Sequence, residues 1–131
     1  MPATESYPDD LRYHPEHDWA RLEGDEAVLG ITWYGQDALG ELVHYEAPEI
    51  GSTVAQGAPC GEVESVKAVS DVVAPLSGEV LEVNQKAVDE PEIVNEDPYG
   101  EGWLIRIRVS DAGEADALMD AEAYGAHVAE Q

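Results

Sequence analysis

Lysine and arginine are scarce in this chain of 131 residues, and aspartate and glutamate are abundant. Six Lys and Arg stand against 29 Asp and Glu, which gives a formal net charge of −23 at pH 7. Nucleic acids and anionic membranes both attract basic surfaces, so neither is an expected partner. Such a charge excess can accompany disorder, but 44% of the residues are apolar, which favours a folded acidic domain.

Cysteine and long apolar runs are also lacking. The one cysteine, Cys60, cannot form an internal disulfide, which favours a reducing compartment, and we interpret it as a buried, inert thiol. No apolar run approaches the roughly 18 residues of a membrane-spanning helix, and the first residues lack the basic and apolar regions of a secretory signal. We therefore expect a cytoplasmic protein.

Metal-binding and catalytic motifs are weak or missing. His14 and His17 have a chelating spacing, but no third ligand set accompanies them, so we expect surface or hydrogen-bonded histidines and no metal site. The chain has no glycine-rich phosphate loop between a strand and a helix, and no Ser-His-Asp order typical of a hydrolase.

Glycine, proline and aspartate recur at short intervals from Trp19 to Val109 and separate short β-rich runs. This pattern predicts an all-β sandwich or barrel. Residues 1–8 are expected to be a flexible tail, and residues 9–131 a single domain. The expected strands are residues 28–31, 62–66, 69–73, 78–83 and 103–109.

Helical segments are expected at two places. A short helical turn is predicted at residues 36–39. After residue 109 the β pattern ends, and Ser110-Asp111 is typical of a helix cap, as is Asp120 before a second turn that contains Tyr124. A C-terminal helical segment is therefore predicted over about residues 112–128.

Lys67 and Lys86 are the two lysines of the chain. Lys67 and Ala68 join the expected strands 62–66 and 69–73, which predicts a β-hairpin with lysine at its tip. An ammonium group there is exposed for acylation, although a solvated turn lysine is the simpler interpretation of this segment alone.

The residues around Lys67 belong to a longer pattern. Residues 61–71 read GEVESVKAVSD, residues 74–80 read APLSGEV, and residues 95–103 read NEDPYGEGW. Together with His17-Asp18-Trp19 and the blocks at residues 30–32, 36–40 and 82–84, they resemble the glycine cleavage system H protein, in the order of that family. The resemblance covers roughly residues 8–128. The hairpin combined with N-x-x-P-Y-x-x-G-W makes it specific.

The resemblance implies a flattened all-β barrel or sandwich of the lipoyl-domain (barrel-sandwich hybrid) type with a short C-terminal helical segment. It implies a carrier and not an enzyme, with lipoic acid joined to Lys67 by an amide. The arm would take the aminomethyl group of glycine from a pyridoxal-phosphate glycine decarboxylase (P protein) to a tetrahydrofolate-dependent aminomethyltransferase (T protein). Dihydrolipoyl dehydrogenase (L protein) would reoxidise it, and a lipoate ligase or lipoyl transferase would install it.

Four further residues are expected to serve this arm. Glu64 and Asp71 flank the tip and are candidates for recognition by the ligase or the partner enzymes, with solvated strand-end carboxylates as an equal alternative. The family's usual His-Glu-Trp has aspartate in the middle here, so Asp18 would contact the amine of the loaded arm in a surface cleft. Tyr34 is the other candidate for that cleft, with a packing role as the alternative.

Two other functions stay open. One is an H-like lipoate carrier of another pathway, such as sulfur oxidation, because Trp33 replaces the acidic residue common in the family. The other is an unmodified module that binds a partner through its acidic face. The family does not require so large a negative charge. With so little lysine, the charge indicates adaptation to a salty cytoplasm, as in a halophile.

Overall fold

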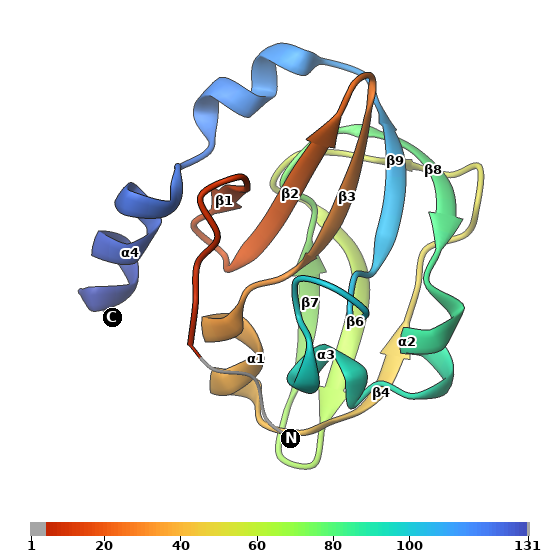
Figure 1. Cartoon of the computed structure of the whole chain (residues 1–131). Coiled ribbons are helices and arrows are strands. Elements are labelled where there is room, and N and C mark those ends of the chain that lie inside the picture. The colour runs from red at the N-terminus through yellow and green to blue at the C-terminus, as the bar shows by residue number, and fades with distance from the viewer. Residues whose placement is uncertain (1–4, 131) are drawn as a thin grey trace.

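Two antiparallel sheets build the protein, as a computed structural model that describes residues 5–130 shows (Figure 1). The larger sheet has the strand order β1-β2-β3-β9-β8-β5, and the smaller has the order β4-β6-β7. The strands are β1 (Arg12–His14), β2 (Asp18–Glu23), β3 (Glu26–Ile31), β4 (Leu42–Glu46), β5 (Thr53–Val54), β6 (Pro59–Ser65), β7 (Val69–Val73), β8 (Gly78–Val83) and β9 (Ile105–Val109). The helices are α1 (Trp33–Leu39), α2 (Gln85–Asp89), α3 (Ile93–Glu96), a 3-10 helix (Ala112–Ala117) and α4 (Ala121–Ala129).

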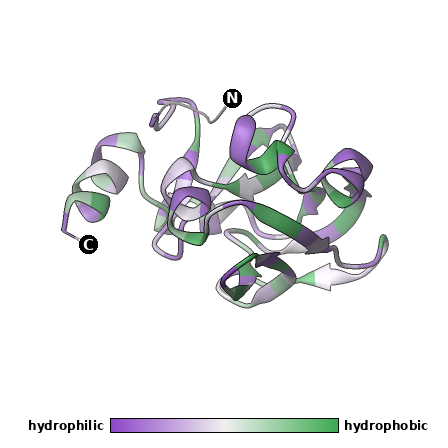
Figure 2. Ribbon diagram, turned by 90° about the horizontal axis from the view of Figure 1, so that it is seen from below, coloured by the Kyte–Doolittle hydropathy of each residue, from purple (hydrophilic) through white to green (hydrophobic). Residues whose placement is uncertain are grey.

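Alternation along the strands gives the larger sheet two apolar faces. On β3, Leu29 belongs to the main core, which side chains of both sheets share, whereas the neighbouring Val28 belongs to a second cluster. That second cluster includes Tyr13 of β1 and Tyr124 of α4. The ribbon coloured by hydropathy shows hydrophobic and hydrophilic segments interspersed along the chain (Figure 2). The C-terminal helix is thus packed on the face of the larger sheet opposite the main core.

The all-β fold with a short C-terminal helical segment is confirmed, and the expected strand at residues 78–83 is β8. The prediction for residues 103–109 was wrong at its start, because β9 begins at Ile105. Before it, the Trp103 N–H donates to the carbonyl of Gly100, and the Trp103 carbonyl accepts from the Asn84 side chain. These backbone groups therefore complete a turn and do not join the sheet ladder.

The predicted helical turn at residues 36–39 is the second half of α1, which begins at Trp33. Thr32 precedes the helix in extended conformation, and its Oγ1 accepts a hydrogen bond from the Gly35 N–H at 3.1 Å. A threonine cap satisfies one of the free N–H groups of the first turn, so the helix starts three residues earlier than expected.

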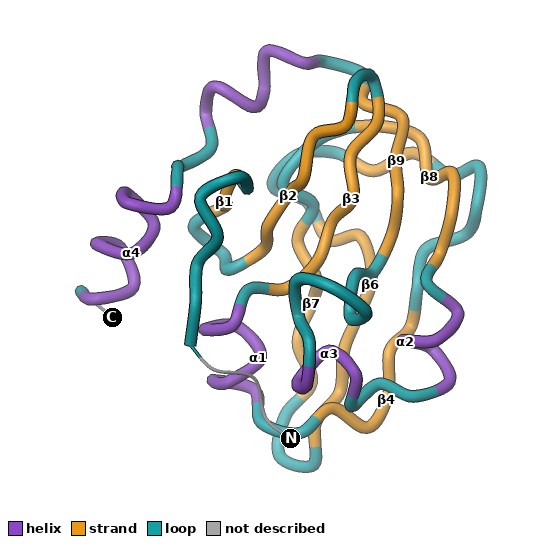
Figure 3. Tube along the Cα trace, viewed as in Figure 1, coloured by secondary structure: helices purple, strands orange, loops and turns teal. Residues whose placement is uncertain are grey.

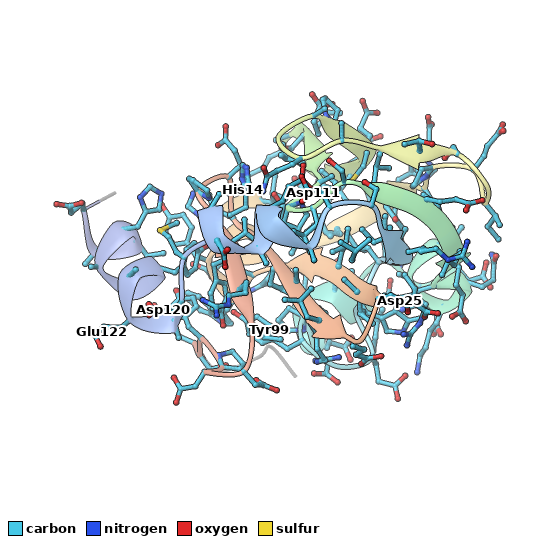
Figure 4. The ribbon with its side chains drawn as sticks, turned by 90° about the horizontal axis from the view of Figure 1, so that it is seen from above. His14, Asp25, Tyr99, Asp111, Asp120 and Glu122 are labelled. Carbon is cyan, nitrogen blue, oxygen red and sulfur yellow. The ribbon has the colours of Figure 1, made fainter. Side chains whose placement is uncertain are left out.

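The C-terminal segment forms two helical pieces separated by a short loop (Figure 3). Both predicted caps are present: Asp111 accepts from the Gly113 N–H at 3.0 Å, and Asp120 accepts from the Ala123 N–H at 2.8 Å. In Figure 4 these two aspartates mark the starts of the 3-10 helix and α4. No helix within residues 5–130 is long and apolar enough to cross a membrane.

The flexible tail expected over residues 1–8 falls partly on residues 1–4, which lie outside the described residues. The ring of Tyr7 packs edge-on against the rings of Tyr13 and Tyr124. The Tyr13 hydroxyl donates to the carbonyl of Pro8 at 2.7 Å. Tyr7 therefore lies against the C-terminal helix, and Pro8 is bonded to β1.

Candidate functional site

The predicted hairpin with lysine at its tip is confirmed as β6 and β7, but its turn has three residues and not two. Strand β6 ends at Ser65, so Val66 belongs to the turn with Lys67 and Ala68. The Ser65 Oγ accepts from the N–H groups of Lys67 at 3.4 Å and Ala68 at 3.2 Å, and the Ser65 N–H donates to the Ala68 carbonyl at 2.8 Å. The serine hydroxyl accepts hydrogen bonds from backbone N–H groups of the turn, so the turn begins directly after Ser65.

The turn presents Lys67 to solvent beside the end of α1. Val66 and Lys67 are both exposed, Val66 at 78%. A Cβ at Gly40, the residue after α1, would lie 3.4 Å from Cε of Lys67. Figure 1 shows the hairpin tip, α1 and α3 gathered at one end of the molecule. The lysine side chain thus lies over a position that has no side chain of its own.

Asn95 of α3 holds this end of α1 in place. Its Nδ2 donates to the Gly40 carbonyl and to Oε1 of Gln36, each at 2.9 Å, and its Oδ1 accepts from the Leu42 N–H at 2.9 Å. One amide therefore links α1 to the start of β4. Asn95 is the first residue of the NEDPYGEGW motif, and no role was expected for it from the sequence.

Two cavities flank α1. The larger, about 400 Å³, is acidic. The smaller, about 170 Å³, lies between α1, β7 and the start of β2. We call the smaller one the arm-side cavity, because residues 70–72 of the hairpin line it. The larger cavity is lined by Gln36, Asp37, Gly40, Glu41, Glu92, Asn95 and Glu96.

Asp18 is a buried carboxylate in the wall of the arm-side cavity, with 3% of its surface exposed. It accepts a hydrogen bond from the Val73 N–H, whereas Oδ2 has no partner among the described residues. Burial raises the pKa of Asp18 well above its usual range, the charge of Glu16 raises it further, and the Val73 hydrogen bond lowers it. A buried carboxylate oxygen without a partner is suited to receive a cationic donor that enters the cavity.

His17 lines the same cavity in a backbone conformation that is rare outside glycine, with φ 75°. The ring of Tyr34 packs on the His17 ring with centroids 4.6 Å apart. Among residues 5–130, Tyr34 itself does not line the cavity. The structure therefore places Tyr34 in contact with the cavity wall, through His17, and not in the lining itself.

The two carboxylates expected beside the tip differ in position. Asp71 of β7 is exposed, lines the arm-side cavity and pairs across the hairpin with Glu62. Glu64 is also exposed, and it pairs with Val69 of β7 and His44 of β4, but it is not among the residues that line the cavity within residues 5–130. Of the four expected residues, Asp18 and Asp71 are brought to one cavity, and Glu64 and Tyr34 are not.

Cys60 is buried, as expected, and burial raises the pKa of its thiol to about 12. The thiolate that would react or bind a metal is therefore disfavoured at neutral pH. Within the part of the chain that the structure describes, no group of three or more His, Cys, Asp or Glu is placed to hold a metal ion.

Comparisons with known proteins agree with one another. The family model of the glycine cleavage H-protein matches residues 11–131. The chain is 51% identical over 123 residues to a glycine cleavage system H protein of Marinobacter nauticus, covering 93% of this chain and 95% of that protein. It is 53% identical over 124 residues to one of Anaeromyxobacter sp. strain K, covering 95% and 97%. The crystal structure of a glycine cleavage system H protein from Mycobacterium marinum is similar, with a TM-score of 0.86 at 42% identity, covering 93% and 98%.

Proposed function

The chain belongs to the glycine cleavage H-protein family, and from that membership we propose that Lys67 carries its lipoyl group. The observation that carries the proposal is the position of Lys67 at the exposed tip of a hairpin whose sequence has the family's pattern. The other lysine, Lys86, forms an ion pair with Glu101 at 3.4 Å and lies outside that hairpin.

The protein is a carrier component of the glycine cleavage system and not a catalyst in its own right, and its partners are the P, T and L proteins. Lys67 would hold the lipoyl group, and that group would supply the chemistry: acceptance of the aminomethyl group of glycine at the P protein, its delivery at the T protein and reoxidation by the L protein. The chain itself has to present, shelter and release this group.

The length of the arm matches the position of the arm-side cavity. A lipoyl-lysine arm reaches on the order of 14 Å from Cα, by bond-length reckoning. Ser70 and Val72, which line the cavity, are three and five residues from Lys67, or about 10 to 17 Å at roughly 3.3 Å per residue of strand. An arm folded back along β7 therefore reaches the cavity, and a tethered group meets it at a high effective concentration.

We assign to Asp18 the contact with the amine of the loaded arm. Its unpartnered Oδ2 in the wall of the cavity supports this role, because an ammonium there would supply the missing donor. The shelter would limit release of formaldehyde and ammonia before the T protein is met. Tyr34 acts in the proposal only through His17, on which its ring packs.

Glu64 and Asp71 are proposed as recognition carboxylates for the lipoate ligase or lipoyl transferase and for the partner enzymes. Both are exposed and lie on the two strands that support the tip. A basic surface on the modifying enzyme would fit them, since charge complementarity steers encounter and fixes orientation. We propose the cytoplasm as the compartment, in keeping with a single buried cysteine.

Reconstitution with purified P, T and L proteins tests the function. Lipoylated protein is expected to support glycine decarboxylation and NADH formation, and the Lys67→Arg variant is expected to support neither. Lipoylation of Lys67 without glycine turnover would reassign the protein to another lipoate-dependent pathway, such as sulfur oxidation. An unmodified Lys67 in cells with active lipoate attachment would instead point to an acidic interaction module.

A further inference from the structure

The hydroxyl of Tyr124 joins His17, in the cavity wall, and Thr32, the cap of α1, to the C-terminal helix. Tyr124 is fully buried, and its Oη lies 2.8 Å from Nδ1 of His17 and 2.7 Å from Oγ1 of Thr32. The hydroxyl has one hydrogen, so it donates to one of these atoms and accepts from the other. The partners are 107 and 92 residues away in sequence, so this contact exists only in the folded chain.

The two residues bonded to the Tyr124 hydroxyl, His17 and Thr32, are each connected to one side of the arm-side cavity. His17 lines the cavity beside Asp18. Thr32 caps α1 through the Gly35 N–H, and Gly35 also lines the cavity. The Tyr124 hydroxyl therefore bonds one lining residue, His17, directly and is connected to a second, Gly35, through Thr32.

The backbone conformation of His17 is unfavourable for a residue other than glycine and is held by the surrounding residues. A non-glycine residue at φ 75° persists where its surroundings hold it, and such residues gather at functional sites. The His17 N–H donates to the His14 carbonyl, and the His17 carbonyl accepts from the Thr32 N–H. The rings of Tyr34, Tyr124 and His127 surround the imidazole, with centroids 4.6 to 5.9 Å away.

The helix that supplies Tyr124 is itself firmly seated. The Tyr124 ring stacks on Tyr13 of β1 with centroids 4.7 Å apart and an interplanar angle of 9°. The backbone of Tyr13 exchanges two hydrogen bonds of 2.8 Å with Met119, just before α4. Figure 3 shows α4 beside β1, and in Figure 4 Asp120 and Glu122 mark its start. The stack and this bridge orient the hydroxyl toward His17.

We propose that Tyr124 is a positioning residue for the arm-side cavity: its hydroxyl, bonded to His17 and to the Thr32 cap of α1, holds the His17 imidazole in the orientation that shelters the loaded arm. The inference rests on the proposed function of the cavity and adds to it a role for the C-terminal helix. Loss of the hydroxyl leaves the backbone hydrogen bond from Thr32 to His17 in place but frees the His17 imidazole to turn, so the cavity is less well shaped to exclude water from the loaded arm.

Tyr124→Phe is the direct test, because it removes the hydroxyl and keeps the ring that stacks on Tyr13. Tyr13→Phe is the matched control, since it removes a hydroxyl of the same aromatic stack that bonds Pro8 and not the cavity wall. In the unmodified proteins, the imidazole ¹⁵N resonances of His17 are expected to shift in Tyr124→Phe and to stay in place in Tyr13→Phe.

The second readout is spontaneous loss of the group from the loaded arm with no T protein present. This loss takes up one water, breaks the carbon–sulfur bond, and yields formaldehyde, ammonia and the free thiol. Tyr124→Phe is expected to lose the group about fivefold faster than wild type, the factor that one neutral hydrogen bond represents. Equal rates in Tyr124→Phe and wild type, or equal acceleration in Tyr13→Phe, would overturn the proposal.

If Tyr124→Phe does not fold, two substitutions at His17 test the proposal instead. Asparagine and glycine both tolerate the left-handed backbone at this position, but only asparagine offers a polar atom to the Tyr124 hydroxyl. His17→Asn is expected to retain the loaded arm better than His17→Gly, and equal loss in the two variants would overturn the proposal. Asp18→Asn separates the two ideas: unchanged loss in that variant contradicts the proposed cavity function itself, whatever Tyr124→Phe does.

Discussion

The side chain of Lys67 lies over Gly40, and a Cβ at Gly40 would stand 3.4 Å from its Cε and 3.9 Å from its Nζ. The two residues are brought together by the β6–β7 turn and by the end of α1, which Asn95 holds through the Gly40 carbonyl. Because no side chain stands at position 40, an arm attached to Lys67 has room to bend past the end of α1 toward the arm-side cavity.

Gly40→Ala is expected to slow lipoylation of Lys67 and to destabilise the fold. The backbone at Gly40 has φ 86° and ψ −166°, a region that alanine enters at a cost of about 1–3 kcal/mol. The rate of lipoylation by a lipoate ligase and urea denaturation measure the two effects. Gly57→Ala is the control, because Gly57 has a similar φ of 81° and open space around it. It should lose stability at an unchanged lipoylation rate. An equal slowing in both variants would show that the contact at Lys67 is irrelevant.

Lys67→Arg is expected to fold as wild type and to remain unmodified. The side chain is exposed at the turn, and a guanidinium group is a poor nucleophile for acylation. Intact mass spectrometry after co-expression with a lipoate ligase, together with a melting curve, checks both points. Lys86→Arg is the matched control and should be lipoylated fully. A large fall in melting temperature for Lys67→Arg would mean that the lysine has a structural role at the tip.

Asp18→Asn is expected to stabilise the protein at neutral pH while it weakens retention of the loaded arm. The pKa of the carboxyl is higher in the folded than in the unfolded chain, so the folded state binds more protons between the two values. Stability therefore falls as pH rises from the unfolded pKa, near 4, through the folded pKa. Below the unfolded pKa, both states are protonated and no penalty remains.

Urea denaturation of Asp18→Asn and wild type across this range checks the prediction. At pH 7 the variant should be more stable than wild type by about 1.4 kcal/mol or more, the free energy that corresponds to one pKa unit, because asparagine places no charge in the buried site. The difference should shrink toward pH 4. Asp71→Asn, the same substitution at an exposed position that lines the same cavity, should change stability at pH 7 much less than Asp18→Asn. A variant less stable than wild type at pH 7 would mean that the ionised carboxylate is well compensated.

Stability is expected to rise with KCl concentration. Among residues 5–130, the ion pairs of lysine and arginine involve Lys86, Arg106 and Arg108, and the formal net charge of the whole chain is −23. Most carboxylates therefore repel one another, and in about 1 M salt such repulsion is screened beyond roughly 3 Å. At pH 7 we expect the melting temperature to be higher by about 5 °C or more at 2 M KCl than at low salt. Near pH 4 the melting temperature should rise less steeply with KCl concentration. A flat profile at pH 7 would refute adaptation to a salty cytoplasm.

Local patterns were enough to predict the hairpin, the caps of the C-terminal helices and the presence of Lys67 at a tip. The position of Val66 in the turn was missed, because it depends on which backbone N–H groups donate to the Ser65 hydroxyl. The roles of Asn95 and Tyr124 were missed for another reason. Their partners lie 53 to 107 residues away, so no pattern of spacing along the chain reveals them.

Peptide mapping of the natively expressed protein by mass spectrometry tests the central claim most directly. The account predicts that the peptide containing Lys67 carries one lipoyl group and that the peptide containing Lys86 carries none. An unmodified Lys67 in cells with active lipoate attachment, or a lipoyl group on Lys86, would contradict it.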